Sequence, residues 1–245
     1  MRLATCGLVA LATAMPAAAS AAEFNATLAT SLSSGRYGGA QTTDALVTAY
    51  GVQAGLNGWR LQMTFPQLQV SGGSGQRIVD GNIVSTGGRR RSGDGDMMLR
   101  IEHNLPVHTP VDLAMAVQFK LPTGARGLTT GGTDATLSVQ ASKTLGPVTP
   151  FASVGYQHVG DGNGLRLKDG WTASAGTMVT AGRTFFLLSY DTSHAIVPGA
   201  PARSVFALAG RPVGRGWSVS LYASKGLSAG AANLTTGIGL TRAFS

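Results

Sequence analysis

Eight polar side chains occupy positions of one parity in three neighbouring segments of the chain. They are Arg60, Gln62, Asp96, Arg100, Glu102, Asp112, Gln118 and Lys120. Residues two apart in an extended strand lie on the same face, so each segment would present these side chains on one side. Opposite charges paired across strands stabilise a sheet by roughly 0.2–1 kcal/mol each. A polar wall can also select the solutes that pass along a channel. Both interpretations stay open: structural filling of a narrow barrel, and selection of solutes.

Histidine is the other residue type that could carry chemistry. A serine hydrolase needs its nucleophile beside a histidine base, and on a strand the two share a face when they are two residues apart. None of the four histidines, at 103, 108, 158 and 194, has a serine two residues later. Ser193 precedes His194 directly, so in an extended chain the two point to opposite faces. We therefore predict no enzyme, and an outer-membrane lipid hydrolase is the least favoured alternative. No metal or other cofactor is expected either, because the histidines lack the paired spacing of a metal site.

Alternation of apolar and polar residues recurs along the chain and predicts β-strands. The clearest example runs from Val111 to Leu121, where every second residue is Val, Leu, Met or Phe. Twelve strands are predicted, at 23–33, 43–54, 58–70, 95–105, 111–121, 134–145, 148–159, 168–180, 183–192, 203–211, 216–225 and 234–244. Pro66 is expected to interrupt the alternation in the third strand, at a bulge or where the strand leaves the membrane.

The composition favours a membrane β-barrel over other classes of protein. Charged residues make up 12% of the chain, against roughly 25% in a soluble domain. After residue 22 no segment has the ~18 consecutive apolar residues of a transmembrane helix. The predicted fold class is therefore all-β, a transmembrane antiparallel up-and-down β-barrel of about 12 strands.

The first residues predict export. Met1 and Arg2 precede an apolar stretch, and the small residues 17–22 form a cleavage site, which together are typical of a signal peptide. We predict a cleaved signal at 1–22 and one barrel domain at 23–245. The only cysteine, Cys6, lies within the signal, so the mature chain has no disulfide. A bacterial envelope protein fits this combination.

The predicted connections alternate in length. The longer ones are 34–42, 71–94, 122–133, 160–167, 193–202 and 226–233, and each is separated from the next by a shorter one. Outer-membrane barrels have short periplasmic turns and longer outer loops. This alternation places both termini in the periplasm and the barrel in the outer membrane.

Aromatic residues gather toward both ends of the predicted strands on the lipid-facing parity. Trp59, Trp217 and Phe244 fall near the periplasmic rim, whereas Phe65, Phe119, Tyr156, Trp171 and Tyr190 fall near the outer rim. Such girdles mark the two interfaces of a membrane. The final strand, with Phe244 next to last, resembles the C-terminal signal that the barrel-assembly machinery recognises. Outer-membrane lipid and that machinery are the partners expected.

Net charge is +8, and three consecutive arginines, Arg89, Arg90 and Arg91, fall in the longest outer loop. Arginine binds phosphate well, so contact with lipopolysaccharide phosphates is one interpretation. A solvated, mobile loop is the other. No basic face on a folded module is visible, so no nucleic-acid partner is expected.

Several short motifs resemble a known family. They are Lys120-Leu121-Pro122-Thr123-Gly124, Gly131-Gly132-Thr133-Asp134, the run 150–156, and Gly93-Asp94-Gly95-Asp96. Their order resembles the outer-membrane β-barrels associated with the MetA pathway of phenol degradation, often labelled transporters, over roughly residues 93–244. The resemblance implies an outer-membrane barrel that passes small hydrophobic or aromatic compounds.

Sequence leaves open whether the lumen is open or plugged. Barrels of ~8 strands are filled by side chains, and those of ~16 enclose an aqueous channel. Seven small inward residues favour some opening: Thr172, Ser174, Gly176, Thr235, Gly237, Gly239 and Thr241. The functional alternatives are a channel for small molecules and a closed structural or surface-interaction barrel whose function lies in the 71–94 loop.

The turn at 106–110 predicts cross-strand neighbours. It would place Asp96 opposite Lys120 and Asn104 near Asp112. Arg60 would then meet Glu102 on the adjacent strand.

Overall fold

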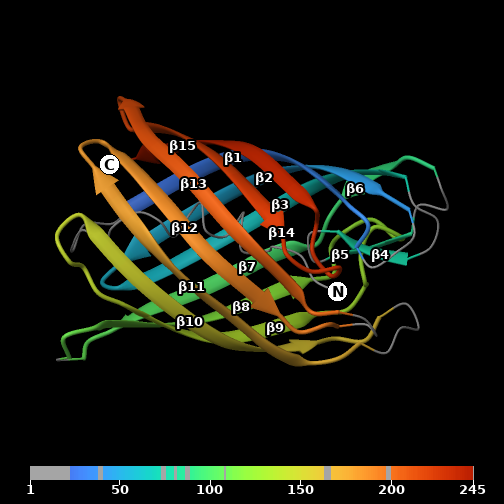
Figure 1. Ribbon diagram of the computed structural model, residues 1–245, viewed down its shortest axis with the longest axis horizontal. Helices are drawn as coiled ribbons and strands as arrows, with labels where there is room; N and C mark the ends of the chain where they lie inside the picture. Colours follow the sequence, from blue (N-terminus) through green and yellow to red (C-terminus); the bar gives the residue numbers. More distant parts are fainter. Residues whose placement is uncertain are drawn as a thin grey trace.

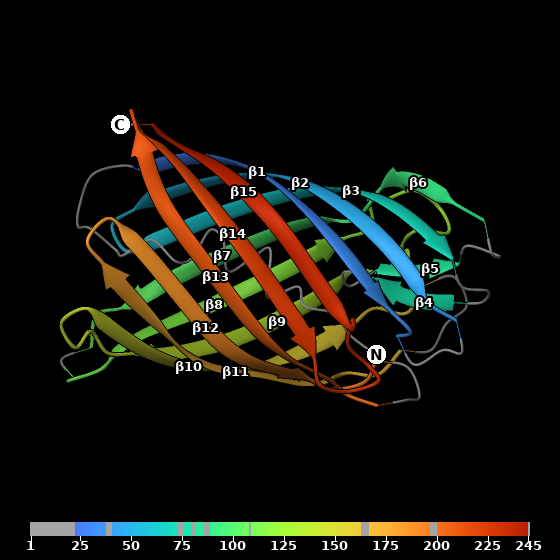
Figure 2. The ribbon, with the colours of Figure 1, turned by 45° about the horizontal axis from the view of Figure 1, so that its top comes forward.

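The protein folds as one closed antiparallel β-barrel (Figures 1 and 2). The computed structural model describes residues 23–37, 41–72, 76–79, 82–85, 89–107, 109–162, 167–196 and 200–244. The twelve long strands are β1 (Glu23–Gly35), β2 (Thr43–Leu56), β3 (Trp59–Gly72), β7 (Met97–Leu105), β8 (Asp112–Leu121), β9 (Asp134–Ser142), β10 (Val148–Val159), β11 (Gly170–Ala181), β12 (Thr184–Ser193), β13 (Ala202–Gly214), β14 (Trp217–Gly226) and β15 (Leu234–Phe244). Each pairs with the next along the chain, and β1 pairs with β15 to close the ring. The predicted fold class is confirmed, and each strand end lies within three residues of its prediction.

Three short strands lie in the connection between β3 and β7. β4 (Gln76–Val79) and β5 (Asn82–Ser85) form a separate hairpin, and β6 (Arg91–Asp94) pairs with the end of β3. The alternation pattern did not predict them. Among the described residues, no helix is long and apolar enough to cross a membrane. The predicted signal segment 1–22 lies outside the described residues.

The two ends of the barrel differ in the length of the connections between their strands. The short ones, 57–58, 106–111, 143–147, 182–183 and 215–216, lie at the end where β1 begins and β15 stops, which we call the turn end. The long ones, with β4, β5 and β6, lie at the opposite end, the loop end (Figure 2). Two of the turns have left-handed backbone at both central residues, at Asn57-Gly58 (φ 50° and 79°) and Arg215-Gly216 (φ 50° and 76°). Positive φ at both central residues gives the type I′ hairpin that matches the twist of the strands.

Large apolar side chains cover the outside of the barrel. The exposed ones include the aromatic residues Trp59, Phe65, Tyr156, Trp171, Tyr190, Trp217 and Phe244, and Phe119 is half-buried. Trp59 and Trp217 are the first residues of their strands at the turn end, and Phe244 is the last of β15. Tyr156 and Trp171 pack edge to face at 5.2 Å near the loop end. Phe65 departs from the expected arrangement, because it lies in the middle of the long strand β3.

At the turn end, aromatic rings contact an arginine and a histidine side chain. Arg242 lies 5.4 Å from the ring centroid of Trp217 and 5.7 Å from that of Phe244. The Trp59 ring stacks on His103 at 4.1 Å. An arginine held over aromatic faces suits a rim where apolar and polar surroundings meet.

Pro66 does not interrupt the alternation, which corrects one expectation. The pairing of β3 with β2 is continuous from Trp59 to Gly72, and inward residues alternate through Pro66 to Leu68 and Val70. The change occurs on the other edge, where the pairing partner of β3 switches from β7 to β6. Proline has no N–H, so it fits the gap between these two ladders. Leu68 and Val70 therefore point into the barrel.

The register of β7 and β8 differs from the prediction by two residues. Lys120 lies opposite Met98 and Asn104 lies opposite Ala114. The cause is the turn, because Leu105 pairs with Leu113 and not with Val111, the first residue after the predicted turn. The predicted pairing of Arg60 with Glu102 is confirmed.

Candidate functional site

The barrel interior holds two cavities that meet. The larger, about 830 Å³, is lined mainly by β7–β14 and runs from Val107 and Pro147 at the turn end to Ile196 and Ala232 at the loop end. The smaller, about 320 Å³, lies against β1–β3 and β11–β14 near the turn end. Both touch Met178 and Thr180, so together they form one lumen.

The structure brings the eight predicted inward residues to this lumen or to its wall. Six line the larger cavity: Arg60, Arg100, Glu102, Asp112, Gln118 and Lys120. Gln62 lines the smaller cavity, and Asp96 is fully buried beside the wall. The role of these residues in selecting solutes stays a prediction.

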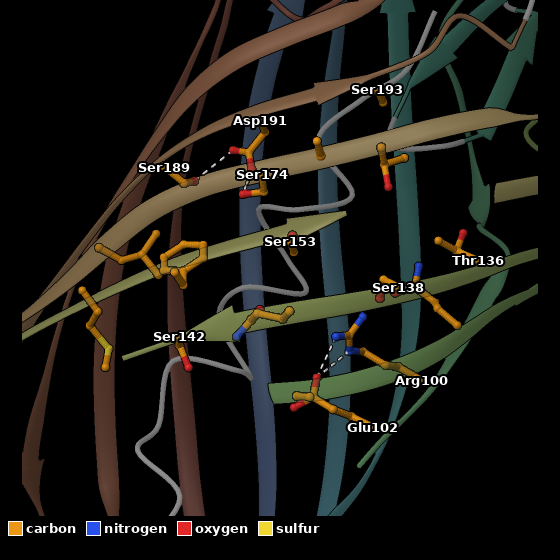
Figure 3. A pocket seen from close by; sticks show the side chains of 18 of the residues that line it. Arg100, Glu102, Thr136, Ser138, Ser142, Ser153, Ser174, Ser189, Asp191 and Ser193 are labelled. Carbon is orange, nitrogen blue, oxygen red and sulfur yellow. Dashed lines mark hydrogen bonds and ion pairs between the residues drawn. The ribbon is translucent and has the colours of Figure 1, made fainter. Parts of the chain in front are cut away.

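Arg60 and Arg100 share the carboxylate of Glu102. The Nη2 and Nε atoms of Arg100 lie 2.6 and 3.2 Å from Oε2 of Glu102 (Figure 3). Nη1 of Arg60 donates a hydrogen bond to the other oxygen of Glu102. Two guanidinium groups with one carboxylate leave one positive charge in excess. Each guanidinium has five N–H donors, so several remain to face the cavity.

Lys120 is the centre of a buried ionic group toward the loop end. Its Nζ lies 3.4 Å from Oδ2 of Asp96, 3.2 Å from Oδ2 of Asp134 and 2.6 Å from the hydroxyl of Thr130. The exposed fractions of Lys120, Asp96 and Asp134 are 6%, 0% and 6%. Burial raises the pKa of Asp96, which lies between β6 and β7 outside the spanning strands, and the charge of Lys120 opposes the rise. Ions this far from water must be paired to be tolerated.

The same group holds the loop-end connections against the wall. Oδ1 of Asp96 accepts the N–H of Gly124 at 3.1 Å, and Oδ1 of Asp134 accepts that of Gly160 at 3.2 Å. A side chain at Gly132 would overlap the carbonyl oxygen of Gly160. The short motifs of the sequence thus have a structural purpose: Lys120, the glycines and Asp134 fold the connection 122–133 inward.

An apolar cluster covers the loop end of the lumen, and we call it the seal. Its buried members are Tyr37, Ala45, Val47, Leu68, Val70, Leu128, Val159, Ile196 and Ala232, with Ala125 and Leu167 packed against them. Five of the six loop-end connections contribute to it, and the rest comes from inward faces of β2, β3 and β10. Because Ile196 and Ala232 also line the larger cavity, the lumen ends at the seal.

Aromatic rings cover two of the seven predicted small inward residues, Gly176 and Gly237, whereas Thr172, Ser174 and Thr235 line the larger cavity and Thr241 lines the smaller one. Phe151 lies directly opposite Gly176, Phe185 opposite Gly210, and Tyr222 opposite Gly237. A Cβ at Gly176 would lie 2.8 Å from the Phe151 ring, and one at Gly237 would overlap the Tyr222 ring. Each ring lies over the backbone of a glycine, which is how aromatic residues compensate for glycine in a sheet. The inner wall at β12–β14 therefore has an apolar section, with Phe185, Leu187, Phe206, Leu208 and Tyr222 in contact.

Gly237→Ala is expected to lower the free energy of unfolding by about 1–3 kcal/mol, because the new methyl group overlaps a ring in a filled site. Gly51→Ala is the matched control. Gly51 is an inward strand glycine too, but the nearest atom to a Cβ there is 3.7 Å away. Urea titrations of both variants in lipid vesicles make the comparison. Equal effects would mean that the Tyr222 ring does not rest on Gly237.

Asp191 is an inward residue that the sequence analysis missed. Its carboxylate lines the larger cavity and accepts hydroxyl hydrogen bonds from Ser174 at 2.6 Å and Ser189 at 2.9 Å (Figure 3). The sequence does indicate this position of Asp191. Tyr190 is predicted to face lipid, so the next residue of the strand must face inward. Asp134 was likewise missed, since it is the first residue of its strand.

The histidines lie at the rims and bind other groups. His158 contacts the carboxylate of Asp169 at 2.8 Å, and Nε2 of His194 lies 2.8 Å from the carbonyl oxygen of Lys168. The hydrogen bonds from His158 and from the N–H of Val159 lower the pKa of Asp169. His103 faces outward as expected, and His108 lies outside the described residues. In the described chain no three His, Cys, Asp or Glu side chains are grouped to hold a metal. The absence of an enzyme activity stays a prediction.

The three consecutive arginines lie at the loop end and are exposed. Arg90 hydrogen-bonds Gln69 of β3, and Arg91 begins β6. Contact with lipopolysaccharide stays a prediction.

Comparison with known proteins gives the fold. No family model matches the chain, and no curated protein matches it. Among solved structures, the translocator domain of the autotransporter NalP from Neisseria meningitidis is similar, with a TM-score of 0.58 and 11% identity, over 98% of this chain and 94% of that one. The CymD monoaromatic hydrocarbon channel is similar with a TM-score of 0.50 and 9% identity, over 93% of this chain and 89% of that one. The chain thus has the fold of outer-membrane β-barrels.

Proposed function

We propose that the protein is an outer-membrane channel that passes small molecules with an apolar part. The observation that carries this proposal is the lumen. A cavity of about 830 Å³ extends from the turn end to the seal. It has charged groups on β3, β7, β8, β9 and β12, and its apolar lining includes Leu113, Phe151, Met178 and Leu187. A cavity of this size and mixed lining suits a small amphipathic molecule.

In this proposal the loop end faces the outside and the turn end faces the periplasm. The aromatic residues at the two rims lie at the membrane interfaces, and Arg89, Arg90 and Arg91 meet lipopolysaccharide phosphates. The seal then separates the lumen from the exterior. Apolar constrictions stop water and ions by dewetting, yet they admit apolar groups. The hydrocarbon channel of the same fold makes aromatic molecules reasonable first probes.

The second candidate function is a closed barrel that acts through its outer surface. The seal favours it, because five connections bury apolar side chains across the mouth of the lumen. A permanently closed seal would leave the interior without access from outside.

Leu128→Ser is expected to raise single-channel conductance in planar bilayers several-fold above that of the parent barrel. Leu128, in the connection 122–133, is buried at the seal. A hydroxyl there would let water into the constriction. Leu227→Ser is the control, because Leu227 lies in another loop-end connection and is 55% exposed. It should leave conductance unchanged.

The results separate the two functions. Conductance that rises for Leu128→Ser alone supports a lumen gated by the seal. Absence of conductance in the parent and in both variants, with each barrel folded by its heat-modifiable mobility, favours the closed barrel.

A further inference from the structure

Asp191 differs from the other buried inward acids of the described chain in having no cationic partner. Asp96 and Asp134 pair with Lys120, and Glu102 pairs with two arginines. Asp191 is 8% exposed, and its hydrogen bonds come from the hydroxyls of Ser174 and Ser189. Hydroxyl groups orient a carboxylate but do not neutralise it. A negative charge with little access to bulk water therefore faces the lumen.

The surroundings of Asp191 provide more acceptors and an apolar surface. Ser204 of β13 lies opposite it in the ladder and lines the same cavity. Leu187, on the same face of β12, belongs to the apolar wall and also lines the cavity. An ammonium group has three donors, which match a carboxylate with hydroxyl oxygens beside it. An apolar body attached to the ammonium group would lie along Leu187.

A group with a positive excess charge lies across the lumen from Asp191. β3 and β12 lie half a ring apart in the strand order, and Arg60 and Arg100 hold one positive charge beyond that of Glu102. Figure 3 shows Arg100 and Glu102 on one side of the cavity and Asp191 on the other. A cation in the lumen is repelled from the arginine side and attracted to Asp191. The two arginines thus disfavour a positively charged group beside them, whereas Asp191 favours one.

We propose that Asp191, Ser174 and Ser189 form a binding site in the lumen for small organic ammonium compounds with an apolar body. The site gives the proposed channel a class of substrate, and this role of the site rests on the proposed channel function. Its ligand binding does not depend on passage, because the cavity reaches the turn end at Val107 and Pro147.

The test is calorimetric titration of the refolded barrel, residues 23–245, in non-ionic detergent with benzylammonium as the probe. Benzyl alcohol has a similar shape without the charge, and benzoate carries the opposite charge. Benzylammonium should bind at least about tenfold more tightly than benzyl alcohol, the difference of one charge-assisted hydrogen bond. This comparison uses the parent protein and needs no variant.

Asp191→Asn should weaken benzylammonium binding about tenfold or more and leave benzyl alcohol binding unchanged. Asp44→Asn removes the same charge from an exposed position of β2 and should change neither. Equal binding of benzylammonium and benzyl alcohol by the parent would overturn the proposal, as would full binding by folded Asp191→Asn. Conductance is measured separately, so loss of the site and loss of the channel are distinguishable.

Discussion

Lys120→Met is expected to lower the free energy of unfolding by about 3–5 kcal/mol at pH 7, because it removes one partner of a buried ionic group. Two carboxylates, Asp96 and Asp134, would lose the ammonium group that lies within 3.4 Å of both. Thr130 would lose its hydrogen bond as well. The measurement is a guanidinium titration in phospholipid vesicles, followed by tryptophan fluorescence. Lys225→Met is the control, since Lys225 is exposed on β14, and it should change stability by about 0.5 kcal/mol or less.

The decrease in the free energy of unfolding caused by Lys120→Met should be smaller at acidic pH. Burial already raises the pKa of Asp96 above its ordinary range, and Lys120 restrains that rise. Without Lys120 the pKa of the folded state rises further above that of the unfolded chain. The folded variant then holds the proton more tightly, so its stability falls as pH increases from about 4 to 7. A loss that does not change with pH would show that the carboxylates are not responsible.

Val154→Arg is expected to lower stability by about 2–4 kcal/mol, whereas Ser153→Arg should cost less than about 1 kcal/mol. Val154 is 49% exposed on the outside of β10, beside Val139 of β9, midway along the strand. An arginine on the lipid face at the midplane of a bilayer lowers the stability of a barrel by about 2–4 kcal/mol. Ser153 faces the lumen and lines the larger cavity, where a charged side chain stays hydrated.

The two arginine variants are compared in urea titrations in vesicles. Ser153→Arg should also reduce any conductance of the Leu128→Ser barrel, because it narrows the lumen. Equal stability of the two variants would contradict either the assignment of faces or the location of β10 in a membrane.

The barrel itself was predictable because two independent patterns agree. The alternation of apolar and polar residues predicts the strands. The alternation of short and long connections predicts the up-and-down order of the strands and the side of the barrel on which both chain termini lie. The pair Arg60 and Glu102 followed from the short turn 57–58, which leaves little freedom of register. The β7–β8 register was two residues wrong because the longer turn 106–111 allows more than one start for β8.

The seal was not predictable by the same means. Four of its nine buried residues come from connections, where no periodicity indicates which side chains fold inward. Leu68 and Val70 follow Pro66, where the sequence predicts an interruption of the alternation, but only one edge of β3 changes partner there. The aromatic rings over Gly176 and Gly237 needed the register of neighbouring strands, which single-strand patterns do not contain.

The pairing of β1 with β15 has a consequence for how the barrel is made. Its registered pairs, from Phe24 with Phe244 to Ser34 with Leu234, join residues two hundred or more positions apart in the chain. Contacts this distant in sequence form slowly. Until residues 234–244 arrive, both edges of the growing sheet expose unpaired backbone groups that could pair with another chain. The chain therefore remains open to aggregation until its last segment is in place, and a truncation that removes only β15 leaves every other strand pair intact in principle but two edges unprotected.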